Sequence, residues 1–353
     1  MSAVPTTFAF LVHPRARLAA DLARIWRPLG RVPEPVYDRC LRSLPLPPVT
    51  MAAAELDGRV AGHVVMVPFG ARHLLAQPGE GRARVSRAVD RAVALGAGVV
   101  GLGALTATVT AGGNALRDRT DIGVTNGNAY TAAVVDTQLR HLLDVNDGGH
   151  VAVVGATGSV GTGVVRLLAR DRAVDRLTLV ARSLPRLQAL ATEAGASLPT
   201  VATQDLAAVR GADVVVLLTA SADALLGPEH LAPGALVLDA TQPRNTSPGL
   251  VTARPDVTVV DGGVVDVPGL RLRGGDIGLP DGRAYACFAE TALLALAGHA
   301  GHFSVGTPSL DQIDHVRALA RRFGHLGFGP AAPTQFGEPV ALPRTGSVAE
   351  VAA

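Results

Sequence analysis

The chain has 353 residues, of which 48% are hydrophobic and 18% charged, and its formal net charge is +2 at pH 7. This composition excludes disorder as the main state and supplies enough apolar material for two domains. Two cysteines exclude a disulfide framework and a metal knuckle. The apolar runs are strand-sized and no signal-peptide pattern begins the sequence. We therefore expect a soluble cytoplasmic protein with no transmembrane segment and no nucleic-acid partner.

The first part of the chain predicts a mixed α/β domain. The expected strands and helices are a strand at 7–13, a helix at 15–29, strands at 51–56 and 59–68, a helix at 80–95, a strand at 98–105 and a helix at 128–145. Asp57-Gly58 separates two of the strands and is typical of a tight hairpin turn. We interpret residues 1–146 as a substrate domain.

From His150 the pattern changes to regular alternation of strands and helices. Apolar strands are predicted at 151–154, 177–181, 214–219, 236–240 and 257–261. Such strands, separated by helices, indicate a parallel sheet covered on both faces, so residues 147–280 predict an NAD(P)-binding Rossmann domain. C-terminal helices in residues 281–329 are expected to pack back on the substrate domain. Residues 330–353 lack periodicity and predict a disordered tail.

A glycine-rich turn follows the first of these strands and precedes a helix. Gly155 permits the tight turn, Gly158 lets the backbone approach a pyrophosphate, and Gly161 allows the helix to pack closely on the strand. The helix N-terminus then faces the phosphates. The cofactor-binding residues predicted in this turn are Gly155, Thr157, Gly158, Ser159, Val160 and Gly161.

The next strand indicates which nicotinamide cofactor binds. An NAD site carries an acidic residue there, whereas this chain has Arg182, Ser183 and Arg186. Two guanidinium groups and a hydroxyl suit a 2′-phosphate, so we predict NADPH as the cofactor. The residues expected beside the nicotinamide ribose, where the strand at 214–219 ends, are Thr219, Ala220 and Ser221.

Cys287 lies in the opening turns of the helix predicted at 282–299, and Glu290 follows one turn later. A thiol near a helix N-terminus has a lowered pKa and is reactive, which makes Cys287 a candidate nucleophile. The competing interpretation is a small buried side chain in the core. Cys40 has no supporting context and is interpreted as structural.

Several motifs together resemble one family, the long-chain acyl-(acyl carrier protein) reductases best known from cyanobacterial alkane synthesis. The shared motifs are FAFLVHP (8–14), LGALT (102–106), TNGNAYTA (125–132), VAVVGATGSVG (151–161), LVARS (179–183), VVDGGVVD (259–266), ACFAE (286–290) and HFSVG (302–306). The resemblance covers roughly residues 7–328. It implies NADPH-dependent reduction of a fatty acyl thioester to an aldehyde.

The resemblance also implies roles for particular residues. Cys287 carries the acyl group as a covalent thioester. The residues on matched motifs that are expected to shape the acyl pocket are Thr106, Asn128, Thr131 and Glu290. The acyl donor is then an acyl carrier protein or acyl-CoA, and a downstream enzyme that consumes the aldehyde is a further expected partner. Acyl chain length stays open.

Other interpretations compete with this one. A shikimate-dehydrogenase-like NADP oxidoreductase shares the domain order, but that family depends on a lysine, and this chain contains none. A non-catalytic NADPH-binding regulator is the other alternative. His302 is a further candidate proton donor, and arginine clusters at 15–31, 82–91 and 317–322 either dock an acidic carrier protein or are ordinary solvated faces.

Overall fold

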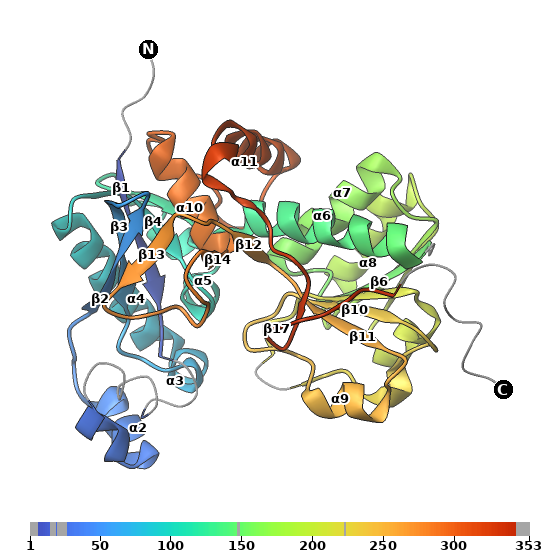
Figure 1. Cartoon of the computed structure of the whole chain (residues 1–353), viewed down its shortest axis with the longest axis horizontal. Coiled ribbons are helices and arrows are strands. Elements are labelled where there is room, and N and C mark those ends of the chain that lie inside the picture. Colours follow the sequence, from blue (N-terminus) through green and yellow to red (C-terminus); the bar gives the residue numbers. More distant parts are fainter. Residues whose placement is uncertain (1–5, 15–18, 20–26, 147–148, 222–223, 344–353) are drawn as a thin grey trace. The chain divides into compact units, whose positions relative to one another are not determined.

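A computed structural model describes residues 6–14, 19, 27–146, 149–221 and 224–343 of the chain (Figure 1). The chain divides into two units. Unit 1 comprises residues 1–130, 265–308 and 314–329, and unit 2 comprises residues 131–264, 309–313 and 330–353. Most of the helix predicted at 15–29 lies outside the described residues.

Unit 1 contains a six-stranded mixed sheet with the strand order β13-β2-β3-β1-β4-β5. Its strands are β1 (Thr7–Val12), β2 (Val49–Leu56), β3 (Arg59–Met66), β4 (Ala97–Leu102), β5 (Gly123–Thr125) and β13 (Leu270–Arg273). β1 pairs in parallel with β3 and β4, whereas β2 and β3 form an antiparallel hairpin. The predicted turn is confirmed, because Asp57 and Gly58 both have positive φ, at 48° and 76°.

Alternation along β1 divides the core of unit 1 between the two faces of the sheet. Ala9 and Leu11 belong to an apolar core that includes side chains of α4 (Pro78–Ala94). Phe8 and Phe10 contact Phe288 of α10 (Ala286–Leu296), with ring centroids 5.3 and 5.1 Å apart. The sheet is therefore sandwiched between α4 and α10 (Figure 1). Thr6, before β1, donates its N–H to the carbonyl of Ala295, so α10 ends near the beginning of β1.

Shorter elements complete unit 1. They are η1 (Arg27–Arg31), α2 (Glu34–Ser43), α3 (Ala71–Ala76), α5 (Leu105–Val109), η2 (Asn114–Leu116), β14 (Arg283–Tyr285) and η5 (Gly324–Leu326). β14 belongs to a small sheet with β12 (Val264–Asp266) and β15 (Gly329–Pro330). Two longer helices, α6 (Asn128–Asn146) and α11 (Leu310–Arg322), continue from one unit into the other along the chain.

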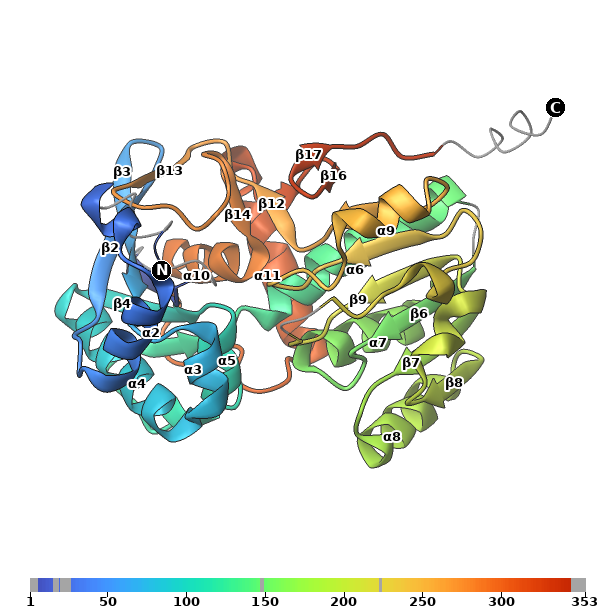
Figure 2. The same cartoon turned by 90° about the horizontal axis from the view of Figure 1, so that it is seen from below.

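Unit 2 is built on a parallel six-stranded sheet with the order β11-β10-β9-β6-β7-β8. Its strands are β6 (His150–Val154), β7 (Arg176–Val180), β8 (Thr200–Thr203), β9 (Val214–Leu217), β10 (Leu236–Asp239) and β11 (Thr258–Asp261). Helices lie on both faces, with α7 (Ser159–Asp171) on one and α9 (Pro248–Ala253) on the other (Figures 1 and 2). The strand order reverses between β6 and β9, as in the doubly wound nucleotide-binding folds. The predicted α/β class with a parallel Rossmann sheet is confirmed.

Other short elements of unit 2 connect or follow these strands. They are α8 (Leu184–Gly195), η3 (Leu206–Gly211), η4 (Pro228–His230), β16 (Thr334–Gln335) and β17 (Glu338–Pro339). β16 and β17 fall in the segment predicted as a disordered tail, which is therefore wrong for residues 330–343. The buried Thr334 hydroxyl donates to the Asp261 carboxylate at 2.9 Å, and this tertiary contact anchors a segment that has no periodicity of its own. The last ten predicted tail residues, 344–353, lie outside the described residues.

The sequence missed one strand of the sheet of unit 2, and two predicted boundaries need correction. β8 was not predicted, because it is an edge strand of partly or fully exposed residues and lacks the apolar run that identified its neighbours. The helix predicted from residue 282 begins only at Ala286, because Arg283–Tyr285 pair as β14. The strand predicted at 98–105 ends at Leu102, and Ala104, with a φ of 48°, turns the chain into α5.

Candidate functional site

Cys287 lies in the first turn of α10, one residue after the helix begins. Its residue is partly exposed. Gly127, in the loop between β5 and α6, packs directly against it. A Cβ at position 127 would lie 2.2 Å from the Cβ of Cys287 and 2.4 Å from its Cα, and Gly127 has a φ of +73°. Only glycine satisfies both this contact and this backbone conformation.

Although the residue as a whole is partly exposed, protein surrounds its thiol, and this loss of solvent dominates the electrostatics of the sulfur. Desolvation raises the pKa of Cys287 to about 12, and the nearby Glu290 carboxyl also raises it. The backbone N–H groups of Phe288 and Cys287 act in the opposite direction and lower the pKa. The predicted lowering of the thiol pKa is therefore wrong for the chain by itself, because desolvation outweighs the helix N-terminus.

Glu290 is fully buried and joins α10 to the beginning of α6. One carboxylate oxygen accepts a hydrogen bond from the Thr125 hydroxyl, and the other accepts from the N–H of Tyr130 at 2.6 Å. The amides of Ala129 and Gly127 also lower the carboxyl pKa, but desolvation is stronger and raises it to about 7. Glu290 thus provides acceptors for N–H groups that the first turn of α6 leaves unpaired. Its role in an acyl pocket stays a prediction.

Asn126 is a buried connector that the sequence did not single out. Its amide nitrogen donates to the carbonyls of Gly112 at 3.0 Å and Gly306 at 2.8 Å. Its amide oxygen accepts from the Ser304 hydroxyl at 2.8 Å and from the N–H of Asn128 at 3.0 Å. The TNGN and HFSVG motifs are therefore held together by one side chain. Their pairing follows only from the tertiary structure.

The remaining predicted residues of the acyl pocket have different environments. Thr106 is fully buried, and its hydroxyl donates to the carbonyl of Gly103 at 2.7 Å. Asn128 and Thr131 are partly exposed on the first turns of α6. His302, the candidate proton donor, accepts from the N–H of Val124 through Nδ1, so its Nε2–H donates to the carbonyl of Arg117. Both ring nitrogens of His302 are thus used to fix its loop.

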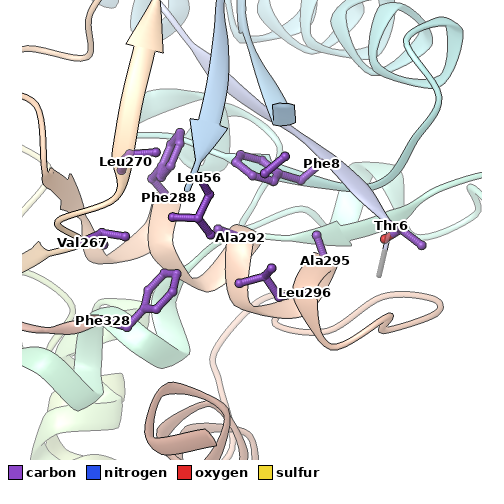
Figure 3. Close-up of a pocket in the computed structure, with 11 residues that line it drawn as sticks. Thr6, Phe8, Leu56, Val267, Leu270, Phe288, Ala292, Ala295, Leu296 and Phe328 are labelled. Carbon is purple, nitrogen blue, oxygen red and sulfur yellow. The ribbon is translucent and has the colours of Figure 1, made fainter. Parts of the chain in front are cut away.

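An apolar cavity of about 20 Å³ lies beside α10 in unit 1 (Figure 3). The side chains that line it come from α10, from strands of the sheet and from the segments around them. The residues are Thr6, Phe8, Leu56, Ala61, Val267, Leu270, Phe288, Ala292, Ala295, Leu296 and Phe328. A cavity of this size holds about one water-sized group. As it stands, it does not accommodate a long acyl chain.

The glycine turn of unit 2 has the geometry of a phosphate cradle. Gly155 has a φ of +87°, and a Cβ there would lie 2.5 Å from the carbonyl oxygen of Leu218. A Cβ at Gly161 would lie 2.4 Å from the carbonyl oxygen of Gly155. Helix α7 begins immediately after Gly158, at Ser159. These residues fit a dinucleotide pyrophosphate, because the turn admits no side chain at Gly155 or Gly161 and directs a helix N-terminus at the ligand.

The residues predicted to select NADPH surround this turn. Arg186 donates to the carbonyl of Thr157 at 2.5 Å, which brings the start of α8 to the glycine turn. Arg182 is exposed at the end of β7, and Ser183 occupies the N-cap position of α8. A guanidinium pair with a nearby hydroxyl at this place suits a phosphate group.

The predicted nicotinamide loop, Thr219–Ser221, follows β9 at the carboxyl edge of the sheet. Ala220 in this loop is exposed, and the predicted cofactor residue Val160 is the second residue of α7. Asn245, which the sequence did not single out, contacts both Thr219 and Ser221 through its side chain. The described residues contain no group of three or more His, Cys, Asp or Glu side chains placed to hold a metal ion.

Comparison with known proteins supports the nucleotide-binding role of unit 2. Residues 150–260 match the family model of the semialdehyde dehydrogenase NAD-binding domain. This region is an NAD(P)-binding domain. The chain therefore contains a nucleotide-binding domain of the kind found in semialdehyde dehydrogenases. No helix in the described part of the chain has the length and hydropathy needed to span a bilayer.

Two curated relatives match larger parts of the chain. A long-chain acyl-(acyl-carrier-protein) reductase from Synechococcus elongatus is 30% identical over 220 residues, which cover 59% of this chain and 62% of the relative. The aminotransferase PigE from a Serratia species is 28% identical over 274 residues, which cover 75% of this chain and 32% of that relative. The chain thus spans less than two thirds of either relative.

Among solved structures, the nucleotide-binding domain of a glutamyl-tRNA reductase from Thermoplasma volcanium matches at 19% identity with a TM-score of 0.29. That match covers 35% of this chain and 84% of the other.

Proposed function

We propose that the chain is an NADPH-dependent reductase that converts a fatty acyl thioester to a fatty aldehyde through an acyl group bound to Cys287. The observation that carries the proposal is a partly exposed cysteine in the first turn of α10, in a chain that also contains an NAD(P)-binding domain. The similarity to a long-chain acyl-(acyl-carrier-protein) reductase supports the choice of substrate.

The first stage is acyl transfer to the protein. The Cys287 thiol gives up its proton, and its sulfur attacks the thioester carbonyl to form a new carbon–sulfur bond. The bond to the donor thiol breaks, and that thiol leaves with a proton. The backbone N–H groups of Cys287 and Phe288, which already favour negative charge on the sulfur, are the proposed donors to the carbonyl oxygen. A thiol of high pKa ionises rarely, but its thiolate is strongly nucleophilic.

The second stage depends on the cofactor site of unit 2. NADPH, when bound, would supply the hydride for conversion of the acyl thioester to an aldehyde; the carbon–sulfur bond then breaks, and the sulfur of Cys287 takes a proton from water to become the thiol again. The glycine turn at Gly155–Gly161 holds the pyrophosphate, and Arg182, Ser183 and Arg186 hold the 2′-phosphate. The loop Thr219–Ser221 contacts the nicotinamide ribose.

The proposal assigns the acyl group to residues 1–146 together with the helices of residues 281–329, and NADPH to residues 147–280. Asn128 and Thr131 on α6 contact the acyl group in this scheme, and Thr106 and Glu290 shape its surroundings from buried positions. The donor is acyl carrier protein or acyl-CoA in the cytoplasm.

The arginine cluster at 82–91 does not act wholly as a docking face for a carrier protein. Arg84 is 3% exposed and donates to the carbonyls of Leu41 and Pro68, each at 2.8 Å. Its guanidinium also lies 4.3 Å from the ring centroid of Phe69. Arg84 therefore holds α2 and α4 together.

A test separates the two stages. Purified protein is incubated with an acyl carrier protein thioester or acyl-CoA, and the covalent adduct is measured by intact mass; NADPH is then added and aldehyde release is followed. Wild type acquires the acyl mass and releases aldehyde, Cys287→Ala does neither, and the matched control Cys40→Ala does both. An adduct on Cys287→Ala, or none on wild type, contradicts the proposal.

The raised pKa of Cys287 favours one alternative, a protein that binds NADPH without turnover. Tight NADPH binding by wild type without any acyl adduct supports that alternative. The aminotransferase activity named for the Serratia relative is not carried over, because this chain has no lysine to form a Schiff base with pyridoxal phosphate.

A further inference from the structure

Asn245 is a fully buried side chain in the loop after β10. Its amide oxygen accepts a hydrogen bond from the Thr219 hydroxyl, and its amide nitrogen donates to the carbonyl of Ser221 at 3.2 Å. Its own carbonyl accepts from the N–H of Leu225 at 3.0 Å. One residue of the β10 loop therefore holds three points of the segment that follows β9.

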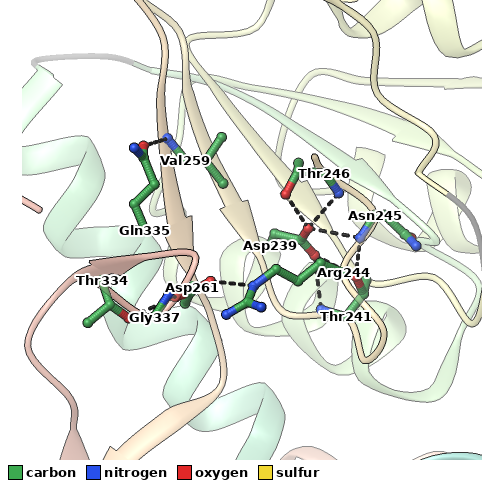
Figure 4. A network of polar contacts seen from close by, with 10 residues as sticks. All are labelled: Asp239, Thr241, Arg244, Asn245, Thr246, Val259, Asp261, Thr334, Gln335 and Gly337. Atoms are coloured by element: carbon green, nitrogen blue, oxygen red, sulfur yellow. Dashed lines mark hydrogen bonds and ion pairs between the residues drawn. The ribbon is translucent and has the colours of Figure 1, made fainter. Parts of the chain in front are cut away.

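Asp239, at the end of β10, fixes Asn245 in this position (Figure 4). One oxygen of its buried carboxylate accepts from the N–H groups of Asn245 and Thr246, both at 2.9 Å, and from the Thr246 hydroxyl at 2.7 Å. The other oxygen accepts from the N–H of Thr241 at 3.1 Å and from its hydroxyl at 2.5 Å. Five hydrogen bonds to one carboxylate make the loop 241–246 a rigid support rather than a free surface loop.

The segment that Asn245 holds lies at the switch point of the sheet. β6 and β9 are adjacent there, and the strand order reverses between them. The glycine turn after β6 touches the chain after β9, since a Cβ at Gly155 would lie 2.5 Å from the carbonyl oxygen of Leu218. Ligands of doubly wound sheets bind outside the carboxyl ends of the strands at this point.

We infer that Asn245 is a positioning residue, which holds Thr219 and Ser221 in the place from which they orient the nicotinamide ribose of NADPH. This inference rests on the proposed cofactor. Asn245 is buried and acts through the loop, so its loss changes the orientation of the reacting ring more than the affinity for the phosphates. The phosphates are held independently by the glycine turn.

The test uses Asn245→Ala in the full-length protein and three measurements. NADPH affinity is measured by fluorescence titration, the emission of the saturated complex reports the environment of the ring, and the reduction step is measured in a single turnover of acylated enzyme. We expect the single-turnover rate to fall about 10- to 100-fold, as for a misplaced reactant. The dissociation constant of NADPH should change less than about fivefold, because the glycine turn is intact. The emission of the complex should differ from that of wild type.

Two further variants separate positioning from loss of stability. Thr334→Val removes one hydrogen bond to Asp261 at the β11 end of unit 2, so it is a control for destabilisation that should leave rate and emission unchanged. Thr219→Val removes the hydrogen-bond partner of the Asn245 amide oxygen and leaves Asn245 itself in place. If both residues act through one contact, the double variant should be no slower than Asn245→Ala alone.

The outcomes distinguish this inference from the proposed function. A wild-type rate and emission in Asn245→Ala, or an equal loss in Thr334→Val, overturns the positioning role. Absence of acyl adduct or of reduction in wild type instead overturns the proposed reaction. In that case the titration and the emission of bound NADPH still decide the role of Asn245.

Discussion

The contact between Gly127 and Cys287 predicts a large effect of adding one methyl group. Gly127→Ala places a Cβ 2.2 Å from the Cβ of Cys287 and 2.4 Å from its Cα, at a φ of +73°. The left-handed conformation costs an L-residue about 1–2 kcal/mol. The overlap adds about 1–3 kcal/mol, because the obstacle is backbone in the first turn of α10 and has no rotamer that relieves it. We expect a total loss of about 2–5 kcal/mol in the free energy of unfolding.

Gly96→Ala is the matched control for this variant. Gly96 also belongs to unit 1 and has a φ of +77°, but a Cβ there would have nothing within 4 Å. Gly96→Ala should therefore lower the free energy of unfolding only by the cost of the left-handed backbone conformation, about 1–2 kcal/mol. Urea unfolding measures both losses, and intact mass measures the rate of acylation by an acyl thioester. Gly127→Ala should also acylate at least about 100-fold more slowly, because the nucleophile is displaced. Equal stability losses in the two variants would refute the reasoning.

Three further predictions concern the two sites. In the Cys40→Ser variant, Cys287 should react with an aromatic disulfide roughly 30- to 60-fold more slowly than a free thiol below pH 9. Its raised pKa leaves about 1000-fold less thiolate, and the higher nucleophilicity of that thiolate offsets only part of this loss. A rate equal to that of a free thiol would contradict the desolvation of Cys287. Glu290 has a pKa raised from 4.5 to about 7, so the folded chain binds the extra proton and stability should fall by about 3 kcal/mol as the pH rises through that window. Glu290→Gln should flatten the dependence of the free energy of unfolding on pH, which urea titrations at several pH values measure. An unchanged pH dependence would show that groups other than Glu290 cause it. Gly161→Ala, whose Cβ would lie 2.4 Å from the Gly155 carbonyl oxygen, should weaken NADPH binding at least about tenfold in a fluorescence titration. Wild-type affinity in that variant would show that the turn does not hold the pyrophosphate.

The amino-acid sequence determined much of unit 2. Apolar strands and a glycine-rich turn are local signals, because a parallel strand buried on both faces must be apolar along its whole length. The hairpin at Asp57-Gly58 is local in the same sense, since two successive residues must adopt positive φ. The position of Cys287 in the first turn of a helix was also predictable from the residues around it.

Only the tertiary structure decided what surrounds these residues. Glu290 reaches donors at Thr125 and Tyr130, more than 150 residues earlier in the chain, and Asn245 reaches Thr219 in the loop after the neighbouring strand β9. The pKa of Cys287 followed this packing rather than its helix position. Desolvation depends on all the groups packed around the sulfur, whereas the dipole effect comes from the one helix that contains the residue. The tail strand β16 pairs with β17, and its contacts with Asp261 and β11 hold this short hairpin against the sheet of unit 2. Sequence periodicity reports the burial of an element, but the partners of a buried polar group are set by contacts between distant segments.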